Sequence, residues 1–128
     1  MNLTLHAIEN RITNQKEKRK HLRFPANWII QGQRVSKELF SGITFDLSIS
    51  GLSIYSSLRL NLEEKVFIKI ECFFDGERKD ISIIGVVKNT SISNDKYRCG
   101  IEFVKLSREN HTFLCQCIAK FRASPGKF

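Results

Sequence analysis

The stretch Asp46-Leu47-Ser48-Ile49-Ser50-Gly51 is the one around which the rest of the chain can be arranged. It reads as a polar turn between two strands, which we expect over residues 39–45 and 52–55. Aspartate and serine side chains hydrogen-bond within turns, and glycine permits a positive φ or a close backbone approach. Such turns are common in β-proteins, so this one alone predicts only a strand–turn–strand unit.

A second cluster, Arg19-Lys20-His21-Leu22-Arg23, lies upstream and places two arginines four residues apart. Arg23 precedes Asp46 by 23 positions. A guanidinium group pairs with phosphate or with the two acceptors on the edge of guanine, whereas a carboxylate accepts from the guanine N–H donors. The two clusters together therefore suit a ligand that carries both phosphates and base edges.

The two clusters resemble the signature of the PilZ domain family, whose members are bacterial receptors for cyclic di-GMP. In that family, Arg-x-x-x-Arg is followed some two dozen residues later by Asp/Asn-x-Ser-x-x-Gly. The resemblance covers about residues 17–121, and the segment Tyr97-Arg98-Cys99-Gly100-Ile101-Glu102-Phe103 is similar to the family's closing strand. It implies a small barrel and a cyclic di-GMP site formed by the residues at the signature positions: Arg19, Arg23, Asp46, Ser48 and Gly51.

The chemistry of the ligand explains why these residue types are needed. An arginine fork can pair with guanine or phosphate, which lysine cannot do in the same geometry, and Asp46 can accept from the guanine N–H groups. Ser48 adds a hydroxyl, and Gly51 either leaves room for the ligand or supplies the turn's backbone angle. The neighbouring cationic residues would support the phosphates: Lys18, Lys20 and His21.

The same residues also have a purely structural interpretation. Arg19 and Arg23 could line a solvated basic segment, and Asp46 and Ser48 could accept from backbone N–H groups of their own turn. For each residue alone that interpretation would be preferred. The joint pattern at this spacing favours the ligand.

Hydrophobic periodicity predicts a mainly β fold, a small six-stranded antiparallel β-barrel with a C-terminal α-helix and a basic N-terminal arm. The strands are expected at 26–31, 39–45, 52–55, 66–73, 81–87 and 97–104. The clearest is 66–73, where apolar residues alternate along one face. We expect a bulge at Ser41-Gly42, and Asp75-Gly76 indicates a hairpin, although Glu77–Lys79 favours a longer loop.

After the last strand, Ser107 is a suitable helix N-cap with Glu109 in the first turn. An apolar stripe follows at helical spacing: Phe113, Leu114, Cys117, Ile118 and Phe121. We expect one domain over 16–123, a helical or flexible tail over 1–15 and a short tail over 124–128.

Charge points to an anionic partner. The chain of 128 residues has a formal net charge of +8, and Met1–Arg23, with six basic and two acidic residues, carries half of that excess. A solvated basic arm is the ordinary interpretation, which the signature downstream outweighs. No apolar run is long enough to span a bilayer and no secretory signal pattern is visible, so we expect no membrane span and a cytoplasmic location.

Nothing in the sequence predicts catalysis, a metal site or a cofactor. His6, His21 and His111 are scattered, with no paired nucleophile and base. The cysteines lack metal-ligand spacing and are expected to be reduced apolar fillers: Cys72, Cys99, Cys115 and Cys117.

The leading hypothesis is therefore a cyclic di-GMP receptor, not an enzyme. Ligand binding would order the arginine arm and signal to an unidentified effector protein. One alternative is a small basic barrel that binds RNA or DNA, which is disfavoured because aromatic residues interleaved with basic ones are not evident. The other is a PilZ module that binds protein independently of a ligand.

Overall fold

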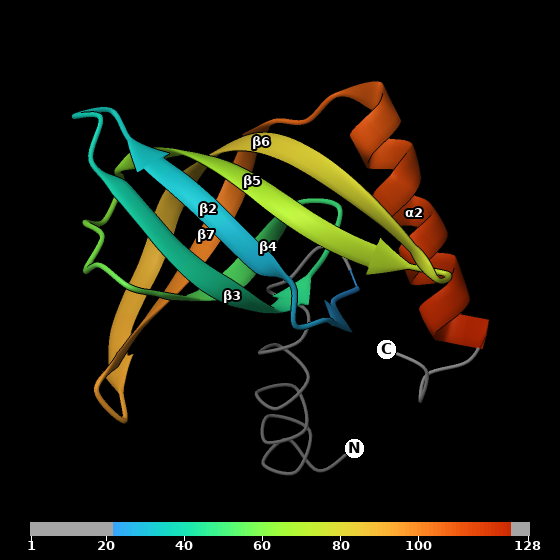
Figure 1. The fold of residues 1–128 in the computed structure, drawn as a ribbon, viewed down its shortest axis with the longest axis horizontal. Coiled ribbons are helices and arrows are strands. Elements are labelled where there is room, and N and C mark those ends of the chain that lie inside the picture. Colours follow the sequence, from blue (N-terminus) through green and yellow to red (C-terminus); the bar gives the residue numbers. More distant parts are fainter. Residues whose placement is uncertain (1–21, 124–128) are drawn as a thin grey trace, which may run out of the picture.

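The computed structural model describes residues 22–123, which form one antiparallel sheet and one helix. The strands are β1 (Phe24–Pro25), β2 (Ile29–Arg34), β3 (Leu39–Leu47), β4 (Gly51–Ser56), β5 (Lys65–Phe74), β6 (Glu77–Ser93) and β7 (Lys96–Lys105), and the helix is α2 (Arg108–Ala123). Neighbouring strands follow the order β1-β3-β2-β5-β6-β7-β4, and β3 also pairs with β4. This last pairing closes the sheet into a ring (Figure 1).

The expected architecture, an antiparallel β-barrel with a C-terminal helix, is confirmed. The six predicted strands correspond to β2 through β7, and the seventh strand, β1, is the difference. It is only two residues long, with Phe24 opposite Leu47 and Pro25 opposite Asp46. So short a strand has no hydrophobic period to detect, yet it fixes the chain beside the Asp46 turn.

Alternating burial along the strands builds the core. In β5, Val66, Ile68 and Ile70 are buried, whereas Phe67 and Phe73 face outward. Each buried aliphatic side chain stabilises the fold by roughly 1.5–3 kcal/mol. Period-two patterning therefore decides which face of the curled sheet points inward.

Two tight turns join the longest strands. Asp75 and Gly76 have φ values of 57° and 80°, and Asn94 and Asp95 have φ values of 50° and 63°. Positive φ at both central residues is the type I′ geometry that matches the twist of a hairpin. The longer loop suggested by Glu77–Lys79 is wrong, because Phe74 pairs directly with Glu77 and the whole of that segment belongs to β6.

The bulge expected at Ser41-Gly42 is also misplaced. The register between β3 and β4 shifts between Thr44 and Asp46, so Phe45 is the extra residue. Gly42 has a different role, because a Cβ there would lie 2.1 Å from the carbonyl oxygen of Tyr55. Glycine at this position lets the two strands approach closely.

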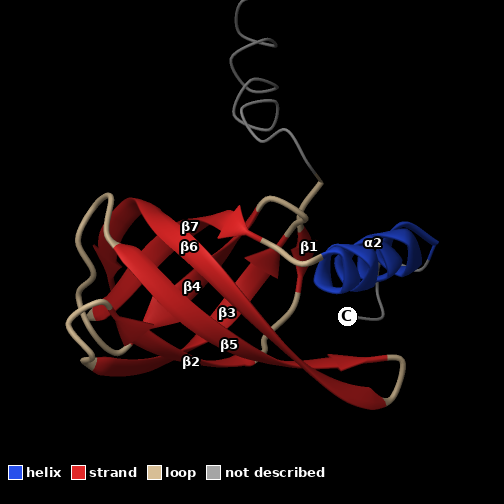
Figure 2. Ribbon diagram, turned by 90° about the horizontal axis from the view of Figure 1, so that it is seen from above, coloured by secondary structure: helices blue, strands red, loops and turns tan. Residues whose placement is uncertain are grey.

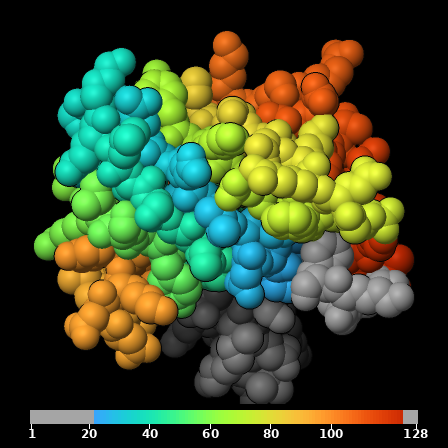
Figure 3. Space-filling view, in the orientation of Figure 1, coloured from blue at the N-terminus to red at the C-terminus, as the bar shows by residue number. Residues whose placement is uncertain are grey.

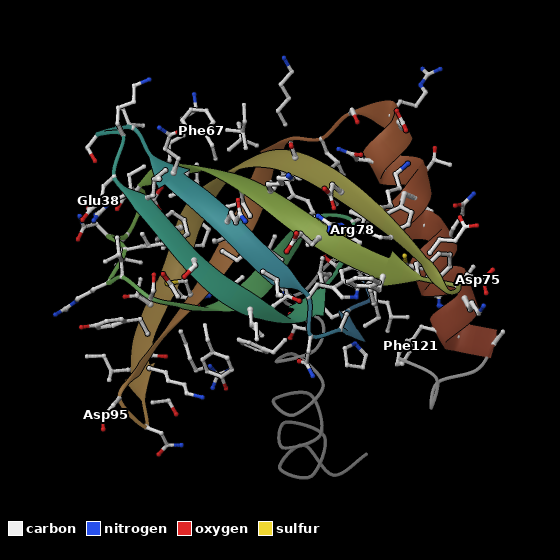
Figure 4. All side chains as sticks on the ribbon, in the orientation of Figure 1. Glu38, Phe67, Asp75, Arg78, Asp95 and Phe121 are labelled. Carbon is white, nitrogen blue, oxygen red and sulfur yellow. The ribbon has the colours of Figure 1, made fainter. Side chains whose placement is uncertain are left out.

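The helix closes one end of the barrel (Figure 2). As predicted, Ser107 caps it, since its Oγ accepts from the Asn110 backbone N–H at 3.1 Å. The predicted apolar stripe faces the core, with Phe113 packed edge-to-face on Phe74 at 5.6 Å between ring centroids. Lys120 pairs with Asp75 at the tip of the β5–β6 hairpin (Figure 4).

Three of the four cysteines are apolar fillers as expected. Cys72, Cys99 and Cys117 are buried free thiols, and burial raises the pKa of Cys117 to about 12. Cys115 departs from the expectation, because it is exposed on the outer face of α2. Its position one residue off the apolar stripe explains the difference.

Candidate functional site

The Asp46–Gly51 segment is a tight turn between β3 and β4, organised by Ser48. The Ser48 backbone N–H donates to the Gly51 carbonyl at 2.8 Å, and the Ser48 Oγ accepts from the backbone N–H groups of Ser50 at 3.1 Å and of Gly51 at 3.2 Å. Ser48 is only 1% exposed. Its hydroxyl is therefore engaged with its own turn.

Gly51, at the end of the turn, lies against strand β7. It is not among the residues with positive φ, so the turn does not need glycine for its backbone angle. A Cβ at this position would lie 2.4 Å from the carbonyl oxygen of Ile101 in β7. Glycine is required because the paired strands β4 and β7 approach closely at this point.

The pairing of β1 with β3 brings Arg23 beside Asp46. The Arg23 Nη1 donates to Asp46 Oδ1 at 2.7 Å and to Ser53 Oγ at 3.1 Å. Both partners are partly buried, with the Arg23 side chain 21% exposed and that of Asp46 18% exposed. An arginine far from the turn in sequence is thus attached to it by an ion pair.

The Arg23 fork is only partly used. Its Nε is buried and has no hydrogen-bond partner among residues 22–123. A buried donor left without a partner costs about 1–3 kcal/mol. One donor of this guanidinium therefore lacks a partner in the part of the chain that the structure describes.

A pocket of about 550 Å³ lies between the turn and the β6–β7 side of the barrel. Its size is typical of small-molecule sites. Arg23, Ser50 and Gly51 contribute to it from one side, and Lys88, Asn89, Glu102 and His111 are among the residues that line the remainder. The pocket thus combines cationic groups with donors and acceptors for polar ligand groups.

The structure brings together four of the predicted site residues: Arg23, Asp46, Ser48 and Gly51. Arg23 and Gly51 line the pocket, whereas Ser48 is turned into its own loop. The remaining candidates lie outside the described residues: Lys18, Arg19, Lys20 and His21.

Several residues around the site were not predicted from the sequence. Ser53 lies opposite Asp46 in the β3–β4 register, a relation that depends on the bulge at Phe45. The residues on the far side of the pocket come from β6, β7 and α2: Lys88, Asn89, Glu102 and His111. No local pattern connects them to the Asp46 turn, since the closed ring alone makes them neighbours.

Within residues 22–123, no group of three or more histidine, cysteine, aspartate or glutamate residues is placed to hold a metal ion. In the same part of the chain, no helix has the length and apolar character needed to cross a bilayer.

The fold is that of a small antiparallel β-barrel domain with a helix at one end. The PilZ domain family model matches residues 17–120, and the chain belongs to the PilZ domain family. That match begins at the basic cluster and extends into α2, so it covers the whole barrel. No match is found among curated protein sequences.

Solved PilZ structures have the same fold. The Bacillus subtilis inhibitor of motility MotI/DgrA superposes with a TM-score of 0.73 at 18% identity, over 83% of this chain and 52% of that one. The PilZ domain of Escherichia coli YcgR with c-di-GMP gives 0.66 at 15% identity, over 87% and 99%. The K. pneumonia MrkH–c-di-GMP complex gives 0.67 at 16% identity, over 85% and 54%. This chain spans about half the length of MotI and MrkH.

Proposed function

We propose that this PilZ protein is a receptor for cyclic di-GMP, which binds at Arg23, Asp46 and the adjoining pocket. The observation that carries the proposal is the guanidinium of Arg23, which Asp46 holds in the lining of a pocket of about 550 Å³. A group that served only to hold the fold would gain more from a fully hydrogen-bonded fork.

The chemical groups of the ligand complement those of Arg23 and Asp46. Cyclic di-GMP carries two phosphates and two guanines, which present anionic oxygens, acceptor edges and N–H donors. The planar guanidinium of Arg23 suits a phosphate or the guanine acceptor edge. Asp46 uses one oxygen for Arg23, and its second oxygen can accept from guanine. Gly51 leaves the pocket rim without a side chain at the turn.

Solved relatives support this class of ligand. The YcgR PilZ domain and MrkH are both described in complex with c-di-GMP, and both have the fold of this chain. We carry that ligand over to this chain on the strength of its own Arg23–Asp46 pair and its membership of the family.

In this proposal, Arg19 is the second arginine of the site, and Lys18, Lys20 and His21 add positive charge near the phosphates. Ligand binding would fasten this arm against the Asp46 turn and signal to an effector protein in the cytoplasm. Amide hydrogen exchange should then slow in residues 16–24 and 46–51 when ligand is added. Protection that is the same with and without ligand would contradict the arm movement but not ligand binding itself.

Calorimetric titration tests the proposed ligand directly. Cyclic di-GMP should bind saturably, whereas GMP, GTP and a single-stranded oligonucleotide should bind far more weakly. Preference for the oligonucleotide would favour the nucleic-acid-binding alternative. Absence of heat with every ligand would favour a PilZ module that acts independently of ligand.

A further inference from the structure

An apolar hollow of about 470 Å³ lies on the outer face of β2, β3 and β4, away from the proposed ligand pocket. Ile29, Ile43 and Tyr55 form a cross-strand row along it, since Ile29 pairs with Ile43 and Ile43 with Tyr55. Small residues line its remaining surface, namely Ser41, Gly42 and Ser56, and Lys96 lies at its edge.

The hollow is built by the strand geometry and is apolar although it faces water. Gly42 allows β3 to approach the Tyr55 carbonyl closely, and the neighbouring Ile43 pairs with Tyr55 on the outer face. Ile29 and Ile43 are 52% and 44% exposed. Clustered exposed aliphatic residues in a concave surface are typical of an interaction site.

Two cations border this surface without a carboxylate partner in the described part of the chain. The Lys96 Nζ lies 5.6 Å from the Tyr55 ring centroid, and the Arg98 Cζ lies 4.6 Å from that of Phe45. Other cations among residues 22–123 are ion-paired instead: Lys69, Arg78, Lys79, Lys88 and Lys120. The hollow therefore combines apolar area with two cations that form no ion pair in the described part of the chain.

These features distinguish between kinds of partner. The Arg98 guanidinium covers the Phe45 ring, and the Phe45 and Tyr55 rings pack together at 5.0 Å, so neither ring is an open platform for stacking a nucleic-acid base. A bilayer needs a projecting apolar surface. The part that projects beside the hollow is the β6–β7 hairpin, which carries Asp95 at its tip (Figures 3 and 4).

We infer that this hollow docks a segment of a partner protein that carries both aliphatic side chains and carboxylates. The aliphatic side chains would fill the space between Ile29, Ile43 and Tyr55, and the carboxylates would pair with Lys96 and Arg98. Charge complementarity of this kind steers association and fixes orientation. The inference does not depend on cyclic di-GMP binding, because it involves none of the pocket residues.

Titration of the ¹⁵N-labelled protein with a synthetic peptide, acetyl-Glu-Leu-Asp-Ile-Glu-Leu-Asp-amide, followed by amide chemical shifts, tests the inference. Shifts should concentrate at residues 29, 41–45, 53–56 and 96–98. A control peptide with lysine in place of each acid should leave them unchanged. Shifts spread over the whole barrel, none at all, or equal shifts with both peptides would overturn the proposal.

Matched charge reversals sharpen the test. Lys96→Glu should weaken binding of the acidic peptide by about fivefold or more, whereas Lys65→Glu should change it less than about twofold. Lys65 is a fair control because it is also an exposed lysine over an aromatic ring, with its Nζ 5.9 Å from the Phe67 centroid. Equal effects of the two variants would contradict a local docking surface.

Three further measurements test other partners that could occupy the hollow. A uridine oligonucleotide or phosphatidylglycerol vesicles that shift these residues more strongly than the peptide would assign the surface to nucleic acid or membrane. Concentration-dependent sedimentation that Ile43→Ser abolishes would assign it to a second copy of this chain. The inference requires that all three leave the surface unaffected.

Discussion

Two arginine–carboxylate pairs stand at opposite ends of β3, and they differ in how completely the arginine is used. Near the start of β3, Arg34 donates from Nε and Nη2 to the two Glu64 oxygens at 2.5 and 2.7 Å. Its Nη1 donates to Glu38 at 2.9 Å. At the end of β3, Arg23 makes one contact to its carboxylate, and its Nε has no partner among the described residues. The side chains of Arg34 and Arg23 are nearly equally exposed, at 18% and 21%.

This difference separates a fully bonded structural ion pair from one whose arginine is a proposed ligand contact. The hydrogen bond to Arg34 holds the pKa of Glu64 below its usual range, despite the opposing effect of burial, as expected for a clamp whose bonding is complete. The Arg23 pair has similar exposure and charge, but the Arg23 Nε has no partner among residues 22–123. We therefore propose that incomplete hydrogen bonding within the described residues, rather than burial or charge, distinguishes Arg23 from Arg34.

The largest effect is expected for Arg23→Ala, which should weaken cyclic di-GMP binding by about 10- to 150-fold, since a charged hydrogen bond contributes about 1.5–3 kcal/mol. Arg23→Lys should also weaken it, because lysine cannot form the fork. Calorimetric titration of each variant beside the unmodified protein measures this. Wild-type affinity in both would remove Arg23 from the site.

The matched change at the other end of β3, Arg34→Ala, should lower stability and leave ligand affinity unchanged. It leaves Glu64 partly buried without its partner, so the free energy of unfolding should fall by about 2 kcal/mol while ligand affinity stays the same. Urea denaturation and calorimetry on the same preparation give both quantities. A loss of affinity as large as that of Arg23→Ala would show that the two pairs are not functionally distinct.

Ser48→Ala should lower stability by about 1 kcal/mol, because the backbone N–H groups of Ser50 and Gly51 lose their acceptor. Any decrease in affinity should be smaller than for Arg23→Ala, since the hydroxyl faces its own turn. Thermal unfolding and titration of the variant check this. Full stability combined with lost binding would instead make Ser48 a direct ligand contact.

The smallest effect concerns pH. Because the pKa of Glu64 is lower in the folded chain than in the unfolded one, its pairing stabilises the fold above about pH 4.3 and is lost as pH falls through the folded value. Glu64→Gln should therefore lose less stability than the unmodified protein between about pH 5 and pH 3, by under about 1 kcal/mol. Parallel denaturation curves at each pH would show that the clamp contributes no pH dependence.

Much of the fold follows from local sequence. The alternation in 66–73, the Ser107 cap and the apolar stripe of α2 were all predictable, because each depends on residues close together in the chain. The displaced bulge shows the limit. Gly42 suggested a bulge by its residue type, but its actual requirement is the approach of the Tyr55 carbonyl from another strand.

The candidate site follows from the sequence in its residue types, whereas its bonding does not. The signature indicated Arg23 and Asp46, and the structure joins them by an ion pair across 23 positions. The inward turn of the Ser48 hydroxyl and the far wall of the pocket depend on ring closure, which no local pattern encodes. The Arg34–Glu64 clamp was missed for the same reason, since 30 positions separate its partners.

The seam between β4 and β7 has a consequence for how the protein folds. The hairpins β5–β6 and β6–β7 join segments that are adjacent in sequence, whereas Gly51 meets Glu102 51 positions later. Long loops are entropically slow to close, so we expect this seam to form last. Mutations at Gly51 and Ile101 should then speed unfolding while leaving the folding rate nearly unchanged, which stopped-flow kinetics can measure. Since the Asp46–Gly51 turn adjoins that seam, a chain that has not finished folding would have no complete site.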